Sequence, residues 1–124
     1  MSTIKVLVGS VVATSSGQTN DSRREVRFEG EELARRTEYG AGREGGITDT
    51  RGVTETLYKT ADGRLIVYVE DWSKWQGEPN VYRLAGVAEA DLDVGGHFED
   101  LGRKAGMCRP LTLDDVLEQE GEAA

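Results

Sequence analysis

The sequence predicts an α+β fold in which a mostly antiparallel sheet of four to five strands precedes two short C-terminal helices. Three observations lead to this prediction. Runs of β-branched and aromatic residues alternate with turn residues, an Asp62-Gly63 pair separates two such runs, and apolar residues recur at helical spacing near the end. The 124 residues can bury one ordinary core, so we expect a single domain over residues 1–124.

The first strand is expected at Thr3 to Ala13, where aliphatic and β-branched residues predominate. A secretory signal is the alternative for this apolar start, but Lys5 lies inside the run and no clear basic region precedes it. A polar loop over residues 14–22 follows. The second strand is expected at Arg24 to Glu29, because Val26 and Phe28 alternate with charged residues.

The next two segments are predicted to be a short helix and a loop. From Glu31 to Glu38, two glutamates each stand four residues before an arginine, a spacing that favours one or two helical turns. From Gly40 to Gly52, five glycines stand among charged residues with almost no apolar side chains. We expect a mobile loop there.

The clearest element is a β-hairpin over Val53 to Trp72. Asp62-Gly63 lies between its two β-rich runs, and glycine accepts the positive φ of such a turn without steric cost. A two-residue turn and a three-residue turn with a bulge both fit the sequence. They place Leu57 and Val67 differently across the sheet. A further strand is expected at Asn80 to Gly86.

Apolar residues recur at helical spacing in the last third of the chain. Phe98, Leu101 and Ala105 lie on one helical face, with Gly106 placed to end the helix. A second helix is expected from Thr112 to Gln119, opened by a variant of the capping box.

Composition indicates a protein of the cytoplasm that does not enter membranes. No run approaches the ~18 apolar residues that a bilayer-spanning helix needs. The single cysteine, Cys108, has no partner for an internal disulfide, which fits a reducing compartment.

The negative charge is concentrated at the end of the chain. Residues 1–86 hold 13 acidic and 12 basic side chains, whereas residues 87–124 hold 10 acidic and 3 basic, which gives the net charge of −8. Such a balance disfavours direct binding of duplex nucleic acid, which depends on Lys and Arg. It favours an acidic protein that binds a basic surface of another protein.

The leading hypothesis is therefore a non-enzymatic interaction protein, and its sharper form is an inhibitor of a nucleic-acid-binding complex that imitates phosphate, as anti-defence proteins do. The partner-binding residues expected for it are two tryptophans and six acids: Trp72, Trp75, Asp91, Asp93, Glu99, Asp100, Asp114 and Asp115. Both tryptophans of the chain fall within four residues. The spacing fits two arrangements about equally. In one, one tryptophan is buried and the other is exposed at an interface; in the other, both are buried as anchors of the turn.

Three motif-like patterns do not predict a catalytic, cofactor or metal site. Gly40 to Gly45 matches G-x-G-x-x-G, but the residues after it cannot begin a helix with a hydrophobic face. Asp91 to Gly102 begins like a calcium loop and lacks the closing glutamate. His97 and Cys108 have no local signature of a nucleophilic pair. We expect no cofactor and no metal.

Two other classes of function fit the sequence. One is a small ligand-binding protein or enzyme whose loop from Gly40 to Gly52 closes over an anionic ligand, gripped by Arg43 and Arg51 in a pocket that includes His97. The other is an oligomeric structural module, such as a homodimer, with Trp72 or Trp75 at a symmetric interface.

Part of the chain resembles a known family. The run Arg24-Glu-Val-Arg-Phe28-Glu-Gly30-Glu-Glu-Leu33-Ala34-Arg35, followed by Leu57-Tyr58-Lys-Thr60-Ala-Asp-Gly63 and Val67-Tyr68, is similar to the central part of the EXLDI family of small bacterial proteins. The resemblance covers about residues 24–72. The segment Glu89-Ala-Asp-Leu-Asp-Val94 departs from the terminal motif of that family by one extra residue and by its position. The family has no established activity, so the resemblance implies a shared fold and no chemistry.

Overall fold

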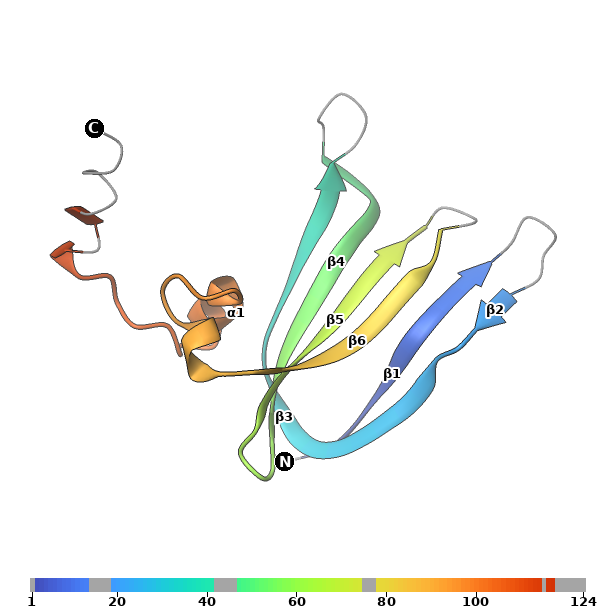
Figure 1. Ribbon diagram of the computed structural model, residues 1–124, viewed down its shortest axis with the longest axis horizontal. Coiled ribbons are helices and arrows are strands. Elements are labelled where there is room, and N and C mark those ends of the chain that lie inside the picture. The colour runs from blue at the N-terminus through green and yellow to red at the C-terminus, as the bar shows by residue number, and fades with distance from the viewer. Residues whose placement is uncertain (1, 14–18, 42–46, 75–77, 115, 118–124) are drawn as a thin grey trace.

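The fold is a six-stranded antiparallel sheet followed by a short helical segment (Figure 1). The structure is a computed structural model, and it describes residues 2–13, 19–41, 47–74, 78–114 and 116–117. The strands are β1 (Ser2–Ala13), β2 (Thr19–Asp21), β3 (Arg24–Ala41), β4 (Ile47–Thr60), β5 (Leu65–Ser73) and β6 (Asn80–Val87). A 3-10 helix, η2 (Glu89–Leu92), and an α-helix, α1 (Glu99–Lys104), follow them.

The sheet closes into a barrel because β1 pairs on both of its edges. The strand order is β2-β1-β3-β4-β5-β6, and β1 also pairs with β6. The pairing of β1 with β3 extends from Ser2↔Gly30 to Val8↔Arg24. The pairing with β6 joins residues 9–11 to residues 80–82. This pairing covers part of the edges that β1 and β6 would otherwise leave free.

One glycine allows β3 to serve two neighbours. Gly30 is opposite Ser2 of β1 and also opposite Thr60 of β4. Gly30 is buried, and a Cβ atom there would lie 2.6 Å from the carbonyl oxygen of Lys59. The backbones can approach this closely only because glycine has no side chain.

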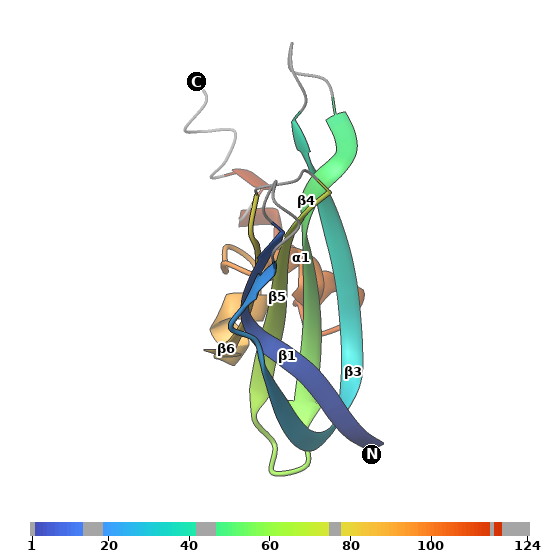
Figure 2. The same ribbon diagram turned by 90° about the vertical axis from the view of Figure 1, so that its right-hand side faces the viewer.

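Side chains alternate between two cores on opposite faces of the sheet. Val6, Tyr58 and Tyr68 form the core inside the barrel. The second core, on the outer face, contains Leu57 and Val67. In Figure 2, β1 lies in front of β4 and β5. Figure 1 shows α1 on the side of the sheet away from β1. The helical segment therefore covers the outer face of the sheet.

The hairpin predicted at Asp62-Gly63 is present, and its turn has three residues. The amide of Thr60 donates to the carbonyl of Arg64, and Gly63 adopts a positive φ of 88°. This is a type I turn followed by a glycine bulge. The register that follows places Leu57 directly opposite Val67, so both side chains belong to the outer core.

The helix predicted from Glu31 to Glu38 is wrong, because this segment is part of β3. Helical i,i+4 ion pairs contribute only about 0.2–0.5 kcal/mol each, which is less than a paired and half-buried strand gains. Arg36 pairs instead with Glu55 on the neighbouring strand, at 2.9 Å. A register shift between Glu32 and Ala34 marks a bulge in this strand.

The α+β class and the antiparallel sheet are confirmed, with three differences. The sheet has six strands rather than four or five, since β2 forms within the expected loop of residues 14–22. Much of the loop expected from Gly40 to Gly52 belongs to β3 and β4. The two C-terminal helices are not confirmed as a pair: the elements are η2 and α1, and part of the segment from Thr112 to Gln119 lies outside the described residues.

Helix α1 is held against η2 by a contact that only glycine allows. A Cβ atom at Gly102 would lie 1.8 Å from the carbonyl oxygen of Leu92. The amide of Phe98 donates to the carbonyl of Asp91 at 2.7 Å. As a result Leu92 and Leu101 are fully buried against the outer face of the sheet.

Replacing Gly102 by alanine is expected to destabilise the protein. Helix propensity alone would make Gly102→Ala favourable by about 1 kcal/mol. The steric conflict with Leu92 is larger, because overpacking a filled core costs roughly 1–3 kcal/mol and here the obstacle is backbone. The free energy of unfolding in urea, followed by circular dichroism, should therefore fall. Exposed Lys104→Ala on the same helix serves as the control and should change it by less than about 0.5 kcal/mol. A Gly102→Ala protein as stable as the wild type would contradict the packing described.

Candidate ligand cavity inside the barrel

A cavity of about 350 Å³ opens at one end of the barrel core. Its walls carry aromatic and charged side chains from β3, β4, β5, β6 and the residue before β3: Arg23, Arg35, Tyr58, Tyr68, Glu70 and Tyr82. Residues 5–7 of β1 complete the wall. This volume is within the range of about 300–1,000 Å³ that is typical of small-molecule sites.

The floor of the cavity is apolar and aromatic. Val6, Tyr58 and Tyr68 are each 7% exposed. The hydroxyl of Tyr68 donates to the carbonyl oxygen of Leu7 at 2.5 Å. Burial raises the pKa of Tyr68 to about 12, and burial also raises the pKa of Tyr58. Both phenols are therefore uncharged at neutral pH.

The aromatic rings are arranged with their faces and edges in contact. Tyr68 and Tyr82 stack with 6.4 Å between ring centroids and 15° between planes. Phe28 meets Tyr58 edge to face at 5.4 Å. The guanidinium carbon of Arg23 lies 5.8 Å from the centroid of Tyr82, which is a cation–π distance.

Both arginines of the cavity are already paired with carboxylates. Arg23 donates through Nε and Nη2 to the two carboxylate oxygens of Asp21, at 2.9 and 2.8 Å. This interaction lowers the pKa of Asp21 to about 2. Arg35 donates to Glu32 at 2.9 Å. Each of these pairs is close to neutral.

Glu70 is the exception. Within the described parts of the chain its carboxylate accepts no hydrogen bond and makes no ion pair, although the residue is half-buried. Burial raises the pKa of Glu70, and the more distant charge of Arg35 opposes this effect. Glu70 is opposite Tyr82 of β6 and lies two residues after Tyr68 on β5. The cavity thus contains one carboxylate that has no direct partner in the described residues and whose charge Arg35 offsets only in part.

A second polar group beside the cavity lacks a partner. Thr56 is 0% exposed, and its Oγ1 has no hydrogen-bond partner in the part of the chain that the structure describes. Thr56 is opposite both Arg35 and Tyr68 in the register. Its side chain therefore belongs to the strand face that lines the cavity. A buried hydroxyl without a partner costs about 1–3 kcal/mol unless water or a ligand satisfies it.

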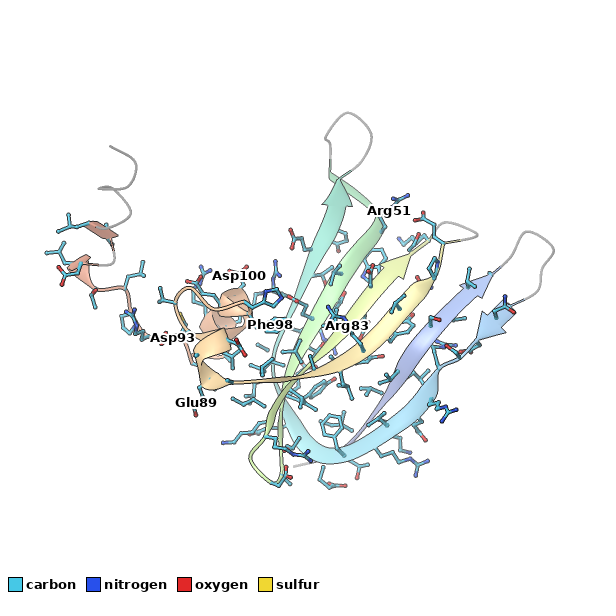
Figure 3. The ribbon with its side chains drawn as sticks, viewed as in Figure 1. Arg51, Arg83, Glu89, Asp93, Phe98 and Asp100 are labelled. Atoms are coloured by element: carbon cyan, nitrogen blue, oxygen red, sulfur yellow. The ribbon has the colours of Figure 1, made fainter. Side chains whose placement is uncertain are left out.

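The six acids expected at a partner surface do not share one arrangement. Asp91 accepts the amide of Ala88 at 2.9 Å, and Asp93 accepts the amide of Arg109 at 3.0 Å. Asp100 pairs with Arg103 and, at 3.6 Å, with Arg36. In Figure 3, Glu89 and Asp100 lie at opposite ends of the helical segment, with Asp93 on its outer side.

The remaining acids are less constrained. Glu99 is half-buried at the start of α1, and Asp114 is exposed after it. Asp115 lies outside the described residues. Of the six, Asp91, Asp93 and Asp100 thus already accept local hydrogen bonds or ion pairs.

Trp72 lies on the opposite face of the sheet from these acids. Its ring covers Gly52, where a Cβ atom would lie 2.8 Å from the ring carbon Cζ2, and its Nε1 donates to Thr54 at 3.1 Å. Tyr39 meets the ring edge to face at 6.0 Å. Trp72 is half-buried by these contacts, and Trp75 lies outside the described residues.

The second expected site, a pocket formed by the loop from Gly40 to Gly52 and His97, is not assembled in the described residues. A hollow of about 140 Å³ beside His97 is lined by residues of β3, β4 and α1. Arg51 pairs with Glu78 at 2.8 Å, near the ends of β4 and β6 (Figure 3), and Arg43 lies outside the described residues. Burial and the charges of two nearby carboxylates raise the pKa of Cys108, which keeps the thiol protonated.

No cluster of three or more side chains suited to a metal ion is found in the residues described. No helix among them has the length and apolar character needed to cross a membrane.

The sequence analysis did not identify the tyrosine-lined cavity. One signal was available: Ile66, Tyr68 and Glu70 alternate along β5, so a carboxylate occupies a position that the pattern assigns to the same face as two large apolar groups. A charged residue in such a position is a candidate for function.

The chain has no recognised relatives in the comparisons made. No protein-family model, no curated protein and no solved structure matches it. Function must therefore be argued from the site itself.

Glu70 should make stability depend on pH in a defined direction. Its folded pKa is raised, so the stability it contributes is fully present below its unfolded pKa and is lost as pH rises through the folded value. Glu70→Gln removes that loss. We expect the melting temperature of Glu70→Gln, relative to wild type, to be higher at pH 7 than at pH 4.

Thermal unfolding followed by circular dichroism at both pH values measures this difference. Exposed Glu31→Gln on β3 controls for removal of one charge and should show a smaller pH dependence. If the difference in melting temperature between Glu70→Gln and the wild type is the same at both pH values, or is smaller at pH 7, the carboxylate is not destabilised in the folded protein.

Proposed function

We propose that this protein binds a small molecule in the cavity of its barrel. The observation that carries the proposal is the combination, in one cavity of about 350 Å³, of an aromatic floor with an unpaired carboxylate. Binding sites for small molecules are mostly apolar and hold a few polar groups that fix orientation.

The walls are suited to binding without large rearrangement. Tyr58 and Tyr68 belong to the barrel core and project from paired strands, and Tyr68 is held by its hydrogen bond to Leu7. Rigid walls reduce the conformational entropy lost when a ligand binds. The ligand therefore meets a surface that is already formed.

The binding can be tested by NMR with a neutral aromatic probe, N-phenyl-1-naphthylamine. We expect the probe to shift the amide resonances of Val6, Tyr58 and Glu70 while leaving those of α1 unchanged, because the two lie on opposite sides of the sheet. Tyr82→Ala should weaken binding about 2- to 10-fold, since an aromatic contact contributes roughly 0.5–1.5 kcal/mol.

Tyr39→Ala is the matched control, because Tyr39 is an exposed tyrosine that does not line the cavity. Its affinity for the probe should equal that of the wild type. Shifts scattered over the outer face, or equal effects of the two tyrosine variants, would overturn the proposal.

A second candidate is the acidic interaction protein expected from the charge distribution. It is favoured by a group of exposed apolar side chains next to Asp114, in the segment that leads away from the sheet in Figure 1: Leu111, Leu113, Val116 and Leu117. Their exposed fractions range from 40% to 73%. Apolar side chains among acids suit a partner groove that is hydrophobic with a basic rim.

This candidate depends on the C-terminal segment more than on the acids of η2 and α1. Imitation of phosphate by Asp91, Asp93 and Asp100 is supported least, because each already accepts a hydrogen bond or ion pair within the chain. The segment is therefore the part to test.

The test is a pull-down from a lysate of the native host, with the wild type and the double variant Leu113→Ser/Leu117→Ser. We expect a basic protein to be retained by the wild type at 50 mM salt, and to be lost at 500 mM salt, because screening shortens the range of charge interactions to a few Å. The double variant should not retain it. If the same protein is retained at both salt concentrations and by the double variant, this candidate is excluded. Light scattering on both proteins shows whether the leucines instead hold a second copy of the chain.

A further inference from the structure

We propose that the ligand of the barrel cavity is an organic cation, whose positively charged group lies beside Glu70 and against the rings of Tyr68 and Tyr82. This inference rests on the proposed function and specifies the chemistry of the ligand. The inference follows from the charged side chains of the cavity, because the arginines are paired with carboxylates and Glu70 has no such partner.

The first argument is the charge balance of the cavity wall. Arg23 is paired with Asp21, and Arg35 is paired with Glu32. Lys5 contributes to the wall but is exposed and alternates with buried Val6, so its side chain belongs to the outside of the barrel. Glu70 has no hydrogen-bond or ion-pair partner in the described residues, and the charge of Arg35 offsets its charge only in part. An anion placed beside it would be repelled, whereas a cation would replace its missing partner.

The second argument is the aromatic surface around Glu70. Glu70 is opposite Tyr82 and two residues from Tyr68, whose rings stack on each other. Aromatic faces attract organic cations, most strongly where water is partly excluded. The guanidinium of Arg23 lies over the ring of Tyr82, which shows that this ring can hold a cation and that a ligand would share it with Arg23. Both the carboxylate and the rings therefore favour the same ligand charge.

The third argument is that the tyrosines stay neutral and can also accept hydrogen bonds. Burial keeps the phenols of Tyr58 and Tyr68 protonated at all physiological pH values. An ammonium group that carries hydrogens matches such acceptors. The net charge of −8 adds a long-range attraction for cations.

The experiment uses three probes that share a phenyl group and differ in charge: 2-phenylethylammonium, 2-phenylethanol and 3-phenylpropionate. Their affinities for the whole protein are measured at pH 7 by NMR titration of the cavity amides. We expect the cation to bind at least 10-fold more tightly than the neutral alcohol, and the anion to bind more weakly than the alcohol.

Glu70→Gln is the decisive variant, because it keeps the shape of the side chain and removes its charge. It should reduce the affinity for 2-phenylethylammonium about 10-fold and leave that for 2-phenylethanol unchanged. Exposed Glu31→Gln should change neither affinity. This control distinguishes the effect of the Glu70 carboxylate from the effect of the protein's net charge.

The possible failures are distinguishable. If the alcohol or the anion binds the cavity as tightly as the cation, the inference is wrong while the proposed function stands. If Glu70→Gln weakens the cation and the alcohol equally, Glu70 supports the cavity structurally and does not recognise charge, which also overturns the inference. If none of the three probes, nor the neutral naphthylamine, shifts the cavity amides, both proposals fail.

Discussion

The structure depends on the close approach of two backbones at Gly30. That contact lets one long strand leave β1 and continue along β4, so that the sheet curves enough for β1 to reach β6. The curvature gives the sheet an inner face and an outer face, and each acquires its own core. The helical segment stabilises the outer face, which leaves the inner face to form the cavity. Without the glycine, neither core would have its present boundary.

Stability and function make different demands on the inner face. A half-buried carboxylate without a partner and a buried hydroxyl without a partner both raise the free energy of the unliganded protein. The outer face shows the opposite pattern, since Arg36 satisfies Glu55 and also contacts Asp100. Within the described residues, Glu70 and Thr56 thus lack partners on the inner face, although Arg23, Arg35 and Tyr68 have theirs. Such a contrast is expected where a protein reserves polar groups for a ligand.

Much of the sheet could be predicted from the sequence, because local patterns determine it. β-rich runs located β1, β5 and β6, and Asp62-Gly63 located the turn between β4 and β5. The prediction failed at residues 31–38, where weak local charge pairs suggested a helix and pairing with a distant strand decided otherwise. The cavity could not be predicted for a related reason. Arg23, Tyr58 and Glu70 come together only after the barrel closes, and the hairpin register that orients them was itself undecided.

Strand β1 is paired more extensively with β3 than with β6, and this difference bears on how the proposed ligand would reach the tyrosines. Seven residue pairs join β1 to β3, and three join it to β6. Residues 9–11, which form this shorter seam, follow the part of β1 that borders the cavity, and Tyr82 belongs to both. Local opening requires the least free energy where few hydrogen bonds are broken. Separation of β1 from β6 at this seam would leave Tyr58 and Tyr68 in place, so exchange of the proposed ligand would not require unfolding of either core.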